Sequence, residues 1–299
     1  MEVINRPDYT EKVKKLFGKG FIIALTGQRR VGKSFIMRQV IKELSQDSAA
    51  HVIYIDKDNE EFSFVQSHEE LTKYVKSNLL SNKRNYLFVD EIQNIKEFEV
   101  SLRSFHTNDE CEMVITGSNA KMLSSELSTY LSGRCVEYHI QSLDYREFLT
   151  FHRLSDNNQS LHSYLKYGGL PQLHRIGLEE TELVDDYLKS VYHTIVLKDV
   201  IEREEIRNVP LLKNLIRFVG DNVGKVFSAS SIVKYLKSQQ VDSSTRVILN
   251  YLEYLCNAYI INRVNRYDIH GKRLFELNDK FYFEDIGIRN SLVASGRSS

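Results

Sequence analysis

Residues 27–34 read Gly-Gln-Arg-Arg-Val-Gly-Lys-Ser, which is a complete G-x-x-x-x-G-K-[ST] phosphate loop. The stretch before it, residues 21–26, is short and apolar, as expected of a buried parallel strand. The stretch after it, residues 35–44, has apolar residues at helical spacing. The loop therefore lies between a strand and a helix, which is the context that phosphate binding requires.

The residue types of this loop fit the chemistry of a nucleotide phosphate. Backbone N–H groups of the loop and the helix N-terminus must surround the phosphate oxygens, and Gly27 and Gly32 permit that close approach. We expect Lys33 to contact the β- and γ-phosphates as a point charge. The Ser34 hydroxyl is expected to ligate the Mg²⁺ that bridges these phosphates.

A second motif lies at residues 86–91, where the apolar run Tyr-Leu-Phe-Val ends in Asp90 and Glu91. A parallel strand delivers such acids to the carboxyl edge of its sheet, where the phosphate loop also lies. Asp90 is expected to hold Mg²⁺, directly or through water, and Glu91 to polarise the water that attacks the γ-phosphorus. An isolated Asp-Glu pair is more often a solvated loop or a helix cap, but the upstream phosphate loop favours the catalytic interpretation.

Further short apolar runs at residues 51–56, 112–116 and 135–139 are each followed by a helical pattern. This alternation predicts an α/β fold with a five-stranded parallel sheet sandwiched by helices. The run at 51–56 separates the two motifs in sequence, which indicates the branch of P-loop proteins that has an extra strand between them. No Asn-Lys-x-Asp guanine-reading motif is present, so ATP is the expected nucleotide.

Residues 115–119, Ile-Thr-Gly-Ser-Asn, form another strand that ends in small polar side chains. A hydroxyl or amide here would sense the γ-phosphate or position the attacking water. The alternative is a turn that caps the next helix, a role that suits Ser118 or Asn119. The two interpretations are compatible.

Composition limits the class of protein. The chain has 299 residues, 42% of them hydrophobic, and 40 basic residues balance 40 acidic ones, which predicts two or three domains. No apolar run approaches the roughly 18 residues of a membrane helix, and residues 1–10 lack signal-peptide features, so we expect a cytoplasmic protein without membrane contact. Cys111, Cys135 and Cys256 lack metal-ligand spacing and are expected to be reduced thiols rather than zinc ligands.

The last third of the chain has helical patterns at residues 211–222, from 228 onward and at 243–256, followed by two β-like stretches. This order predicts a winged helix-turn-helix. Its third helix is expected to pack through Leu249, Leu252 and Leu255. The residues of that helix expected to face a DNA major groove are Ser244, Thr245, Arg246 and Asn250. The wing that follows is expected to carry Arg263, Arg266, Lys272 and Arg273. Ten Lys and Arg oppose seven Asp and Glu between residues 223 and 290, an excess of three that does not distinguish DNA contact from protein docking or a nucleotide-lid role.

These motifs resemble those of the AAA+ superfamily of ATPases. More narrowly, the chain is similar to a prokaryotic family of predicted P-loop ATPases that joins an AAA+ module to a winged helix and a conserved C-terminal domain of unknown role. The matching stretches are residues 26–34, 87–93, 116–118, 131–134, 143–148, 167–171 and 280–290. Relatives in that family continue into a nuclease-like domain, which this chain, ending at Ser299, is expected to lack.

The resemblance implies a strand order of 5-1-4-3-2 and a helical lid. The expected domains are an AAA+ core at 1–153, the lid at 154–207, the winged helix at 208–290 and a flexible tail at 291–299. Arg6 would lie near the adenine, Arg134 would act as an arginine finger on the γ-phosphate of a neighbour in a homo-oligomer, and Arg203 would be a sensor. The alternative for Arg134 and Arg203 is a surface arginine or an ion pair at the sheet edge.

The expected function is that of a Mg²⁺-dependent ATPase whose cycle moves the lid and winged helix and is coupled to double-stranded DNA or a partner protein. Alternatives are a slow nucleotide-dependent switch in signalling or defence and an ATP-binding protein that tethers DNA; Glu91 and the winged helix argue against a small-molecule kinase. The expected catalytic residues are Lys33, Glu91, Asn119 and Arg134, and the expected metal ligands are Ser34 and Asp90. The residues expected to bind ATP or ADP are Arg6, Gly27, Gln28, Arg29, Arg30, Val31, Gly32, Lys33, Ser34 and Phe35.

Overall fold

The structure, a computed structural model, describes residues 4–120, 133–265 and 279–295. The chain forms two compact units. The first comprises residues 1–27 and 31–141, and the second comprises residues 28–30 and 142–299. The tip of the phosphate loop, residues 28–30, thus groups with the second unit.

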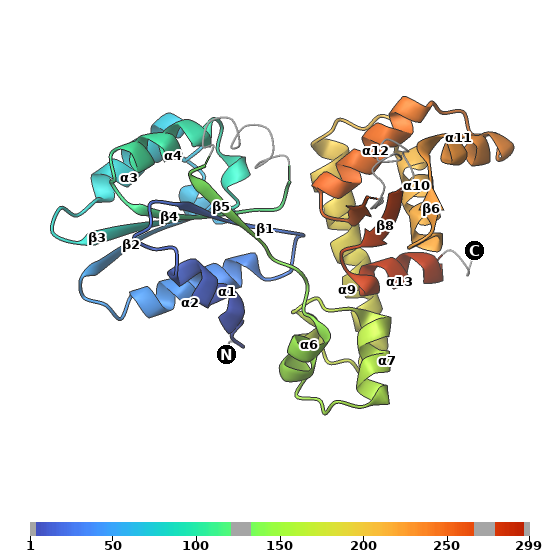
Figure 1. Cartoon of the computed structure of the whole chain (residues 1–299), viewed down its shortest axis with the longest axis horizontal. Helices are drawn as coiled ribbons and strands as arrows, with labels where there is room; N and C mark the ends of the chain where they lie inside the picture. Colours follow the sequence, from blue (N-terminus) through green and yellow to red (C-terminus); the bar gives the residue numbers. More distant parts are fainter. Residues whose placement is uncertain (1–3, 121–132, 266–278, 296–299) are drawn as a thin grey trace, which may run out of the picture. The chain divides into compact units, whose positions relative to one another are not determined.

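The first unit is built on a five-stranded sheet in the order β2-β3-β4-β1-β5, with all pairs parallel (Figure 1). The strands are β1 (Ile22–Thr26), β2 (Ala50–Asp56), β3 (Arg84–Asp90), β4 (Glu112–Gly117) and β5 (Cys135–His139). The predicted α/β fold and strand order are confirmed. β2 follows β1 and precedes β3 in sequence, as predicted, while in the sheet β4 lies between the two motif strands and β2 lies at the edge.

Helices cover both faces of this sheet. Figure 1 shows α1 (Pro7–Lys14) and α2 (Lys33–Leu44) on one face, and α3 (His68–Asn78) and α4 (Phe98–Thr107) on the other. Short 3-10 turns, η1 (Glu60–Phe62) and η2 (Ile92–Asn94), lie in the connections. All five residues of β1 are buried, which is why that strand reads as a continuous apolar run. Leu71 of α3 and Phe105 of α4 pack with Leu87 of β3 in a buried apolar cluster.

The second unit begins with helices α6 (Tyr145–His152), α7 (Asn158–Tyr167), α8 (Leu173–Ile176) and α9 (Thr181–Thr194). A π-helix, η4 (Ile195–Glu202), continues α9. Then follow α10 (Val209–Asp221), β6 (Val226–Phe227), α11 (Ala229–Ser238), α12 (Thr245–Asn257), β7 (Ile261–Val264), β8 (Asp279–Phe283) and α13 (Ile286–Ser295). The three strands pair antiparallel in the order β6-β8-β7.

Two expectations for this unit need correction. Residues 291–295 do not belong to a flexible tail but to α13, which packs against α7, α9 and α10. The sequence misled here because tertiary packing, rather than local pattern, stabilises the last turns of a helix. Leu249 is 37% exposed instead of packed, and Ile248 takes the buried position on α12. Arg266, Lys272 and Arg273 lie outside the described residues.

Asp285 connects two segments of the second unit that are far apart in sequence, the end of α7 and the start of α13. Its carboxylate is buried and accepts hydrogen bonds from the backbone N–H groups of Gly169 at 2.9 Å and Ile288 at 3.0 Å. Gly287 must be glycine, since a Cβ there would lie 1.9 Å from the Tyr167 carbonyl oxygen. Burial raises the pKa of Asp285, and the bonds from these N–H groups oppose that rise. This carboxylate therefore joins α7 to the start of α13.

Two properties expected from composition have structural counterparts. Among the residues that the structure describes, none of the helices has the length and apolar character needed to cross a membrane. The three cysteines form no disulfide. Burial raises the pKa of the Cys111 and Cys135 thiols to about 12 and that of Cys256 to about 11, so these thiols are unreactive at neutral pH.

Candidate nucleotide-binding site

The phosphate loop leaves β1 at Gly27 and enters α2 at Lys33. Gly27 has φ +135°, and a Cβ there would lie 2.2 Å from the Ile140 carbonyl oxygen, so only glycine fits. Arg30 also has a positive φ, +70°. Lys33 is buried, and its ammonium donates to the Gly27 carbonyl at 2.9 Å, across the loop that it serves.

Arg6 supports the loop from the N-terminal segment. Its guanidinium Nη1 donates to the carbonyl oxygens of Val31 at 3.1 Å and Gln141 at 3.0 Å. Its backbone N–H donates to the Gln39 side chain of α2. Arg6 is 4% exposed, so it fixes the end of the loop from inside the first unit. Its predicted place near the adenine stays a prediction.

Ser34, Asp90 and Thr116 meet at the carboxyl edge of the sheet. The Ser34 hydroxyl hydrogen-bonds the Asp90 carboxylate, and the Thr116 hydroxyl donates to Asp90 Oδ1. Burial raises the pKa of Asp90, and the nearby carboxylates of Glu91 and Asp56 raise it further. The contact between Thr116 and Asp90 was not predicted, because it joins β3 and β4 across 26 positions.

This oxygen-rich donor set fits Mg²⁺. A hard cation prefers a hydroxyl and a carboxylate, keeps several waters and takes its remaining ligands from a nucleotide. Ser34 and Asp90 would supply the protein part of such a set, since their side chains hydrogen-bond one another. No cluster of three or more His, Cys, Asp or Glu suited to a metal occurs in the described part of the chain.

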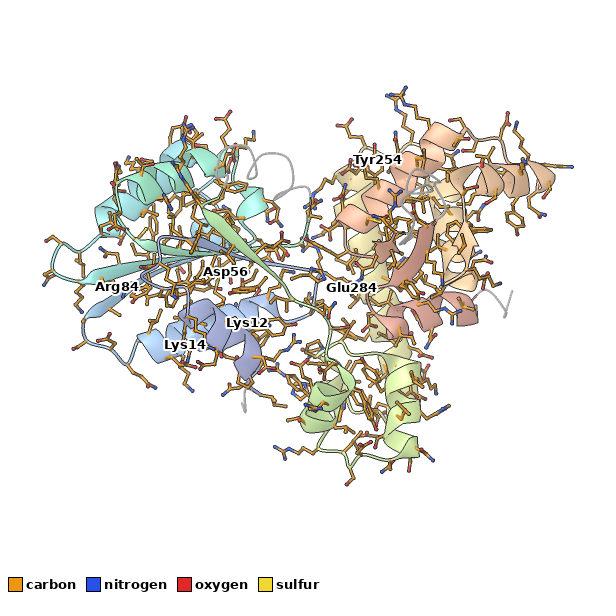
Figure 2. All side chains as sticks on the ribbon, viewed as in Figure 1. Lys12, Lys14, Asp56, Arg84, Tyr254 and Glu284 are labelled. Atoms are coloured by element: carbon orange, nitrogen blue, oxygen red, sulfur yellow. The ribbon has the colours of Figure 1, made fainter. Side chains whose placement is uncertain are left out.

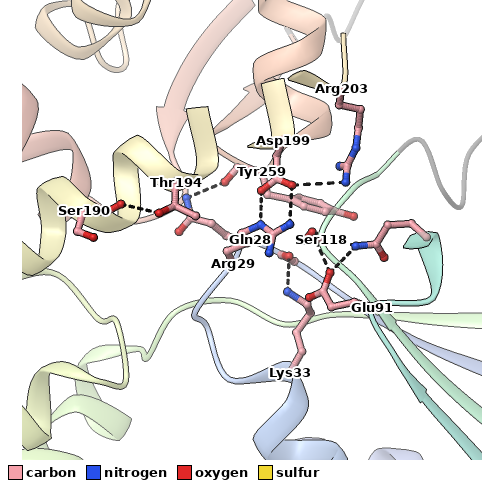
Figure 3. A network of polar contacts seen from close by, with 12 residues as sticks. Gln28, Arg29, Lys33, Glu91, Ser118, Ser190, Thr194, Asp199, Arg203 and Tyr259 are labelled. Carbon is pink, nitrogen blue, oxygen red and sulfur yellow. Dashed lines mark hydrogen bonds and ion pairs between the residues drawn. The ribbon is translucent and has the colours of Figure 1, made fainter. Parts of the chain in front are cut away.

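Glu91 lies next to this pair in an unusual backbone conformation. It is 7% exposed and has φ +56°, in the left-handed region that only a minority of non-glycine residues adopt. Its carboxylate accepts hydrogen bonds from the Ser118 hydroxyl at 3.3 Å and from the Gln93 amide (Figure 3). The backbone N–H of Glu91 donates to Thr116 Oγ1 at 2.9 Å. Gln93, which the sequence analysis did not single out, thus helps to orient the expected catalytic carboxylate.

The edge strand β2 places Tyr54 and Asp56 near Asp90. In the register of β2 and β3, Asp56 lies opposite Asp90. Tyr54 donates its hydroxyl toward Asp56 at 3.3 Å and Asp90 at 3.4 Å, and Arg38 of α2 donates to Asp56 at 3.1 Å. Burial raises the pKa of Tyr54 to about 12, so it stays a proton donor. Asp56 is the last residue of β2 and Arg84 is the first residue of β3, so the two side chains labelled in Figure 2 lie at opposite ends of these neighbouring parallel strands.

The remaining predicted residues fall in different places. Asn119 is 3% exposed and follows β4, close in sequence to Ser118. Phe35 is 41% exposed at the start of α2. Arg134 is exposed and accepts a hydrogen bond from the N–H of Ile22, so it lies at the amino end of β1, opposite the phosphate loop. A role for Arg134 in its own chain's site is therefore incompatible with this placement, whereas a role toward a neighbour stays a prediction.

The tip of the loop makes its contacts within the second unit. Gln28 donates to the Tyr259 carbonyl at 2.9 Å. The Arg29 guanidinium forms a two-pronged ion pair with Asp199, with Nε–Oδ2 at 2.6 Å and Nη2–Oδ1 at 3.0 Å (Figure 3). Arg203 contacts the same carboxylate at 3.5 Å. Asp199 was not predicted, since nothing in its local sequence pattern marks it as a partner of residue 29.

Comparisons with known proteins agree with this geometry. A family model described as an AAA domain matches residues 19–149, and one described as a domain of unknown function (DUF8612) matches residues 158–299. An uncharacterized protein of Haemophilus influenzae is 32% identical over 97% of this chain and 74% of its own length. An uncharacterized protein of Methanocaldococcus jannaschii is 29% identical over 85% of this chain and 58% of its own length.

A solved structure shows the same fold. The Walker-type ATPase of Pyrococcus abyssi superposes with a TM-score of 0.67 and 16% identity, covering 97% of this chain and 96% of that chain. The phosphate loop, the parallel sheet and the two carboxylates at its edge lie within the part of the chain that the AAA domain model matches. The chain belongs to the same family as the Haemophilus influenzae protein.

Proposed function

We propose that the protein is a Mg²⁺-dependent enzyme that hydrolyses ATP and couples the hydrolysis cycle to DNA through its second unit. The observation that carries the proposal is the pair of adjacent acids at the end of β3. The loop hydroxyl of Ser34 hydrogen-bonds the Asp90 carboxylate, while the Glu91 carboxylate accepts hydrogen bonds from Ser118 and Gln93. One acid is thereby placed for a metal and the other for a water.

Each residue then has a chemical task. The loop N–H groups and Lys33 bind the phosphate oxygens. To do so, the Lys33 ammonium gives up its hydrogen bond to the Gly27 carbonyl and donates to a phosphate oxygen instead. Glu91 accepts a proton from the attacking water, and the hydrogen bonds from Ser118 and Gln93 fix the direction of its carboxylate. Mg²⁺, when bound, neutralises charge on the β- and γ-phosphate oxygens. Ser34 and Asp90 would hold it.

The Thr116 hydroxyl provides a direct test of this arrangement. Thr116→Val keeps the side-chain shape but removes the donor to Asp90 and the acceptor for the Glu91 N–H. We expect kcat for ATP hydrolysis to fall about tenfold, because a hydrogen bond to a charged group is lost at the site. Steady-state phosphate release over a range of Mg²⁺ concentrations measures the effect. Thr116→Ser, which keeps the hydroxyl, should retain most activity; equal losses in both variants would refute the role of the hydroxyl.

Coupling to DNA is proposed from the second unit. Helices α10, α11 and α12 with the antiparallel sheet β6-β8-β7 have the order of a winged helix. Ser244 caps α12, and Thr245 and Arg246 are exposed in its first turn, where a recognition helix contacts base edges. We propose that residues 154–207 form the lid and that the winged helix begins at residue 208.

Duplex DNA is therefore expected to raise ATP turnover. Binding through Arg246 and its neighbours is electrostatic, so the stimulation should disappear as salt rises from about 50 to 200 mM. The measurement is phosphate release with and without duplex DNA, for the native chain and for Arg246→Ala, which should lose the stimulation and keep the basal rate. If DNA left basal turnover unchanged in low salt, the proposed coupling to DNA would be wrong. Nucleotide-dependent self-association without turnover would favour a switch instead.

A further inference from the structure

The π-helix η4 places one acidic residue among apolar ones. Buried residues recur in pairs at a constant spacing of four: Val191 and Tyr192, Ile195 and Val196, Asp199 and Val200. In an α-helix, positions eight apart differ by about 80° around the axis, so the third pair would rotate away from the first. The wider π turn over Ile195–Glu202 reduces that rotation and keeps Asp199 on the buried face.

A buried carboxylate in this position requires a partner. Asp199 is 1% exposed, and an unpaired carboxylate in such surroundings is strongly unfavourable. Both of its oxygens are engaged by the Arg29 guanidinium, at 2.6 Å and 3.0 Å, the parallel geometry in which arginine binds carboxylates best. Arg203, one turn further along, adds a second positive charge at 3.5 Å.

The residue held by this ion pair lies in the middle of the phosphate loop. On one side of Arg29, Gln28 is anchored to the Tyr259 carbonyl. On the other side, Arg30 has a left-handed φ of +70°, a conformation that persists only where the surroundings enforce it. The two side-chain anchors at Gln28 and Arg29 therefore hold the loop in a shape that it would not keep by itself.

We propose that Asp199 is a positioning residue for nucleotide binding: through Arg29, it holds the phosphate loop in the conformation that receives the phosphates. The proposal rests on the proposed binding of ATP by this loop. Without the ion pair the loop relaxes, and the protein must restore its shape when the nucleotide binds. The effect therefore falls on nucleotide affinity rather than on the chemical step.

The test is a double-mutant cycle read out by equilibrium binding of a fluorescent ATP analogue. Asp199→Asn is expected to weaken binding about tenfold, because a charge-assisted, two-pronged contact is lost, and to raise KM much more than it lowers kcat. Arg29→Gln is expected to weaken binding similarly. If Asp199 acts through Arg29, the double variant loses no more affinity than either single variant.

Asp279→Asn is the matched control. Asp279 also forms an ion pair with an arginine, Arg263, whose Nε lies 2.6 Å from Asp279 Oδ2, within the small antiparallel sheet of the same unit. Its replacement should lower thermal stability but leave the dissociation constant for the ATP analogue unchanged. This separates loss of an ion pair in general from loss of the pair at the loop.

The outcomes separate this inference from the proposed function. A native chain that does not bind the ATP analogue overturns both. A native chain that binds it, with Asp199→Asn unchanged or tighter, overturns only the positioning role of Asp199. Additive losses in the double variant likewise exclude action through Arg29.

Discussion

Replacing Glu91 with Gln is expected to lower ATP turnover at least about a hundredfold while ATP still binds. The amide cannot accept the proton of the attacking water, but it keeps the size of the carboxylate and can still hydrogen-bond Ser118 and Gln93. The loop, Lys33 and Asp90 are untouched. Steady-state phosphate release and equilibrium binding of an ATP analogue, measured on the same preparations, give the two numbers.

Glu112→Gln is the control for this experiment. Glu112 begins β4, so it lies at the amino edge of the sheet, where it pairs with Arg84 at 2.6 Å. The same chemical change at that edge should leave turnover within about twofold of native, because Glu112 lies at the end of the strands opposite to the phosphate loop. If Glu91→Gln retained native turnover, the assignment of Glu91 as the general base would be wrong.

Replacing Asp285 with Ala is expected to destabilise the second unit by at least about 3 kcal/mol. The change leaves the N–H groups of Gly169 and Ile288 buried without their acceptor. It also removes the contact between α7 and the start of α13 on which the close approach of Gly287 to Tyr167 depends. Urea unfolding followed by circular dichroism measures the loss.

Two further variants serve as controls for the Asp285→Ala measurement. Asp285→Asn keeps one acceptor oxygen and should fall between Ala and native. Asp221→Ala changes an exposed aspartate at the end of α10, where the expected effect is within about 0.5 kcal/mol. Equal stabilities of Asp285→Ala and native protein would show that the buried hydrogen bonds do not hold the unit together.

The sequence predicts the parts of this protein that depend on local pattern. The strand before Gly27 is wholly buried, so it reads as an apolar run, and the loop residues are required in a fixed order by the phosphate chemistry. Asp90 and Glu91 follow a strand of the same kind, and parallel strands place their carboxyl ends on one edge. Fold class and the two motifs were predictable for these reasons, whereas the strand order was implied by the resemblance to AAA+ ATPases.

Contacts across long stretches of sequence were not predictable. Asp199 pairs with Arg29 over 170 positions, and Asp285 with Gly169 over 116. Thr116 was noted as part of a polar strand end, but its bond to Asp90 depends on β4 lying beside β3. Residues 291–295 were expected to belong to a tail, because this short, uncharged stretch has no periodic pattern of its own. Packing of α13 against other helices places it in that helix. Local spacing contains none of this information.

The central claim is that this loop and these two acids hydrolyse ATP with Mg²⁺. The most direct measurement is phosphate release from ATP by the native chain, with Mg²⁺ and with the metal removed by a chelator, beside Lys33→Ala. The account predicts turnover that requires Mg²⁺ and is absent in Lys33→Ala, because that variant loses the ammonium now bonded to the Gly27 carbonyl. Turnover that is the same without Mg²⁺, or that survives in Lys33→Ala, would contradict it.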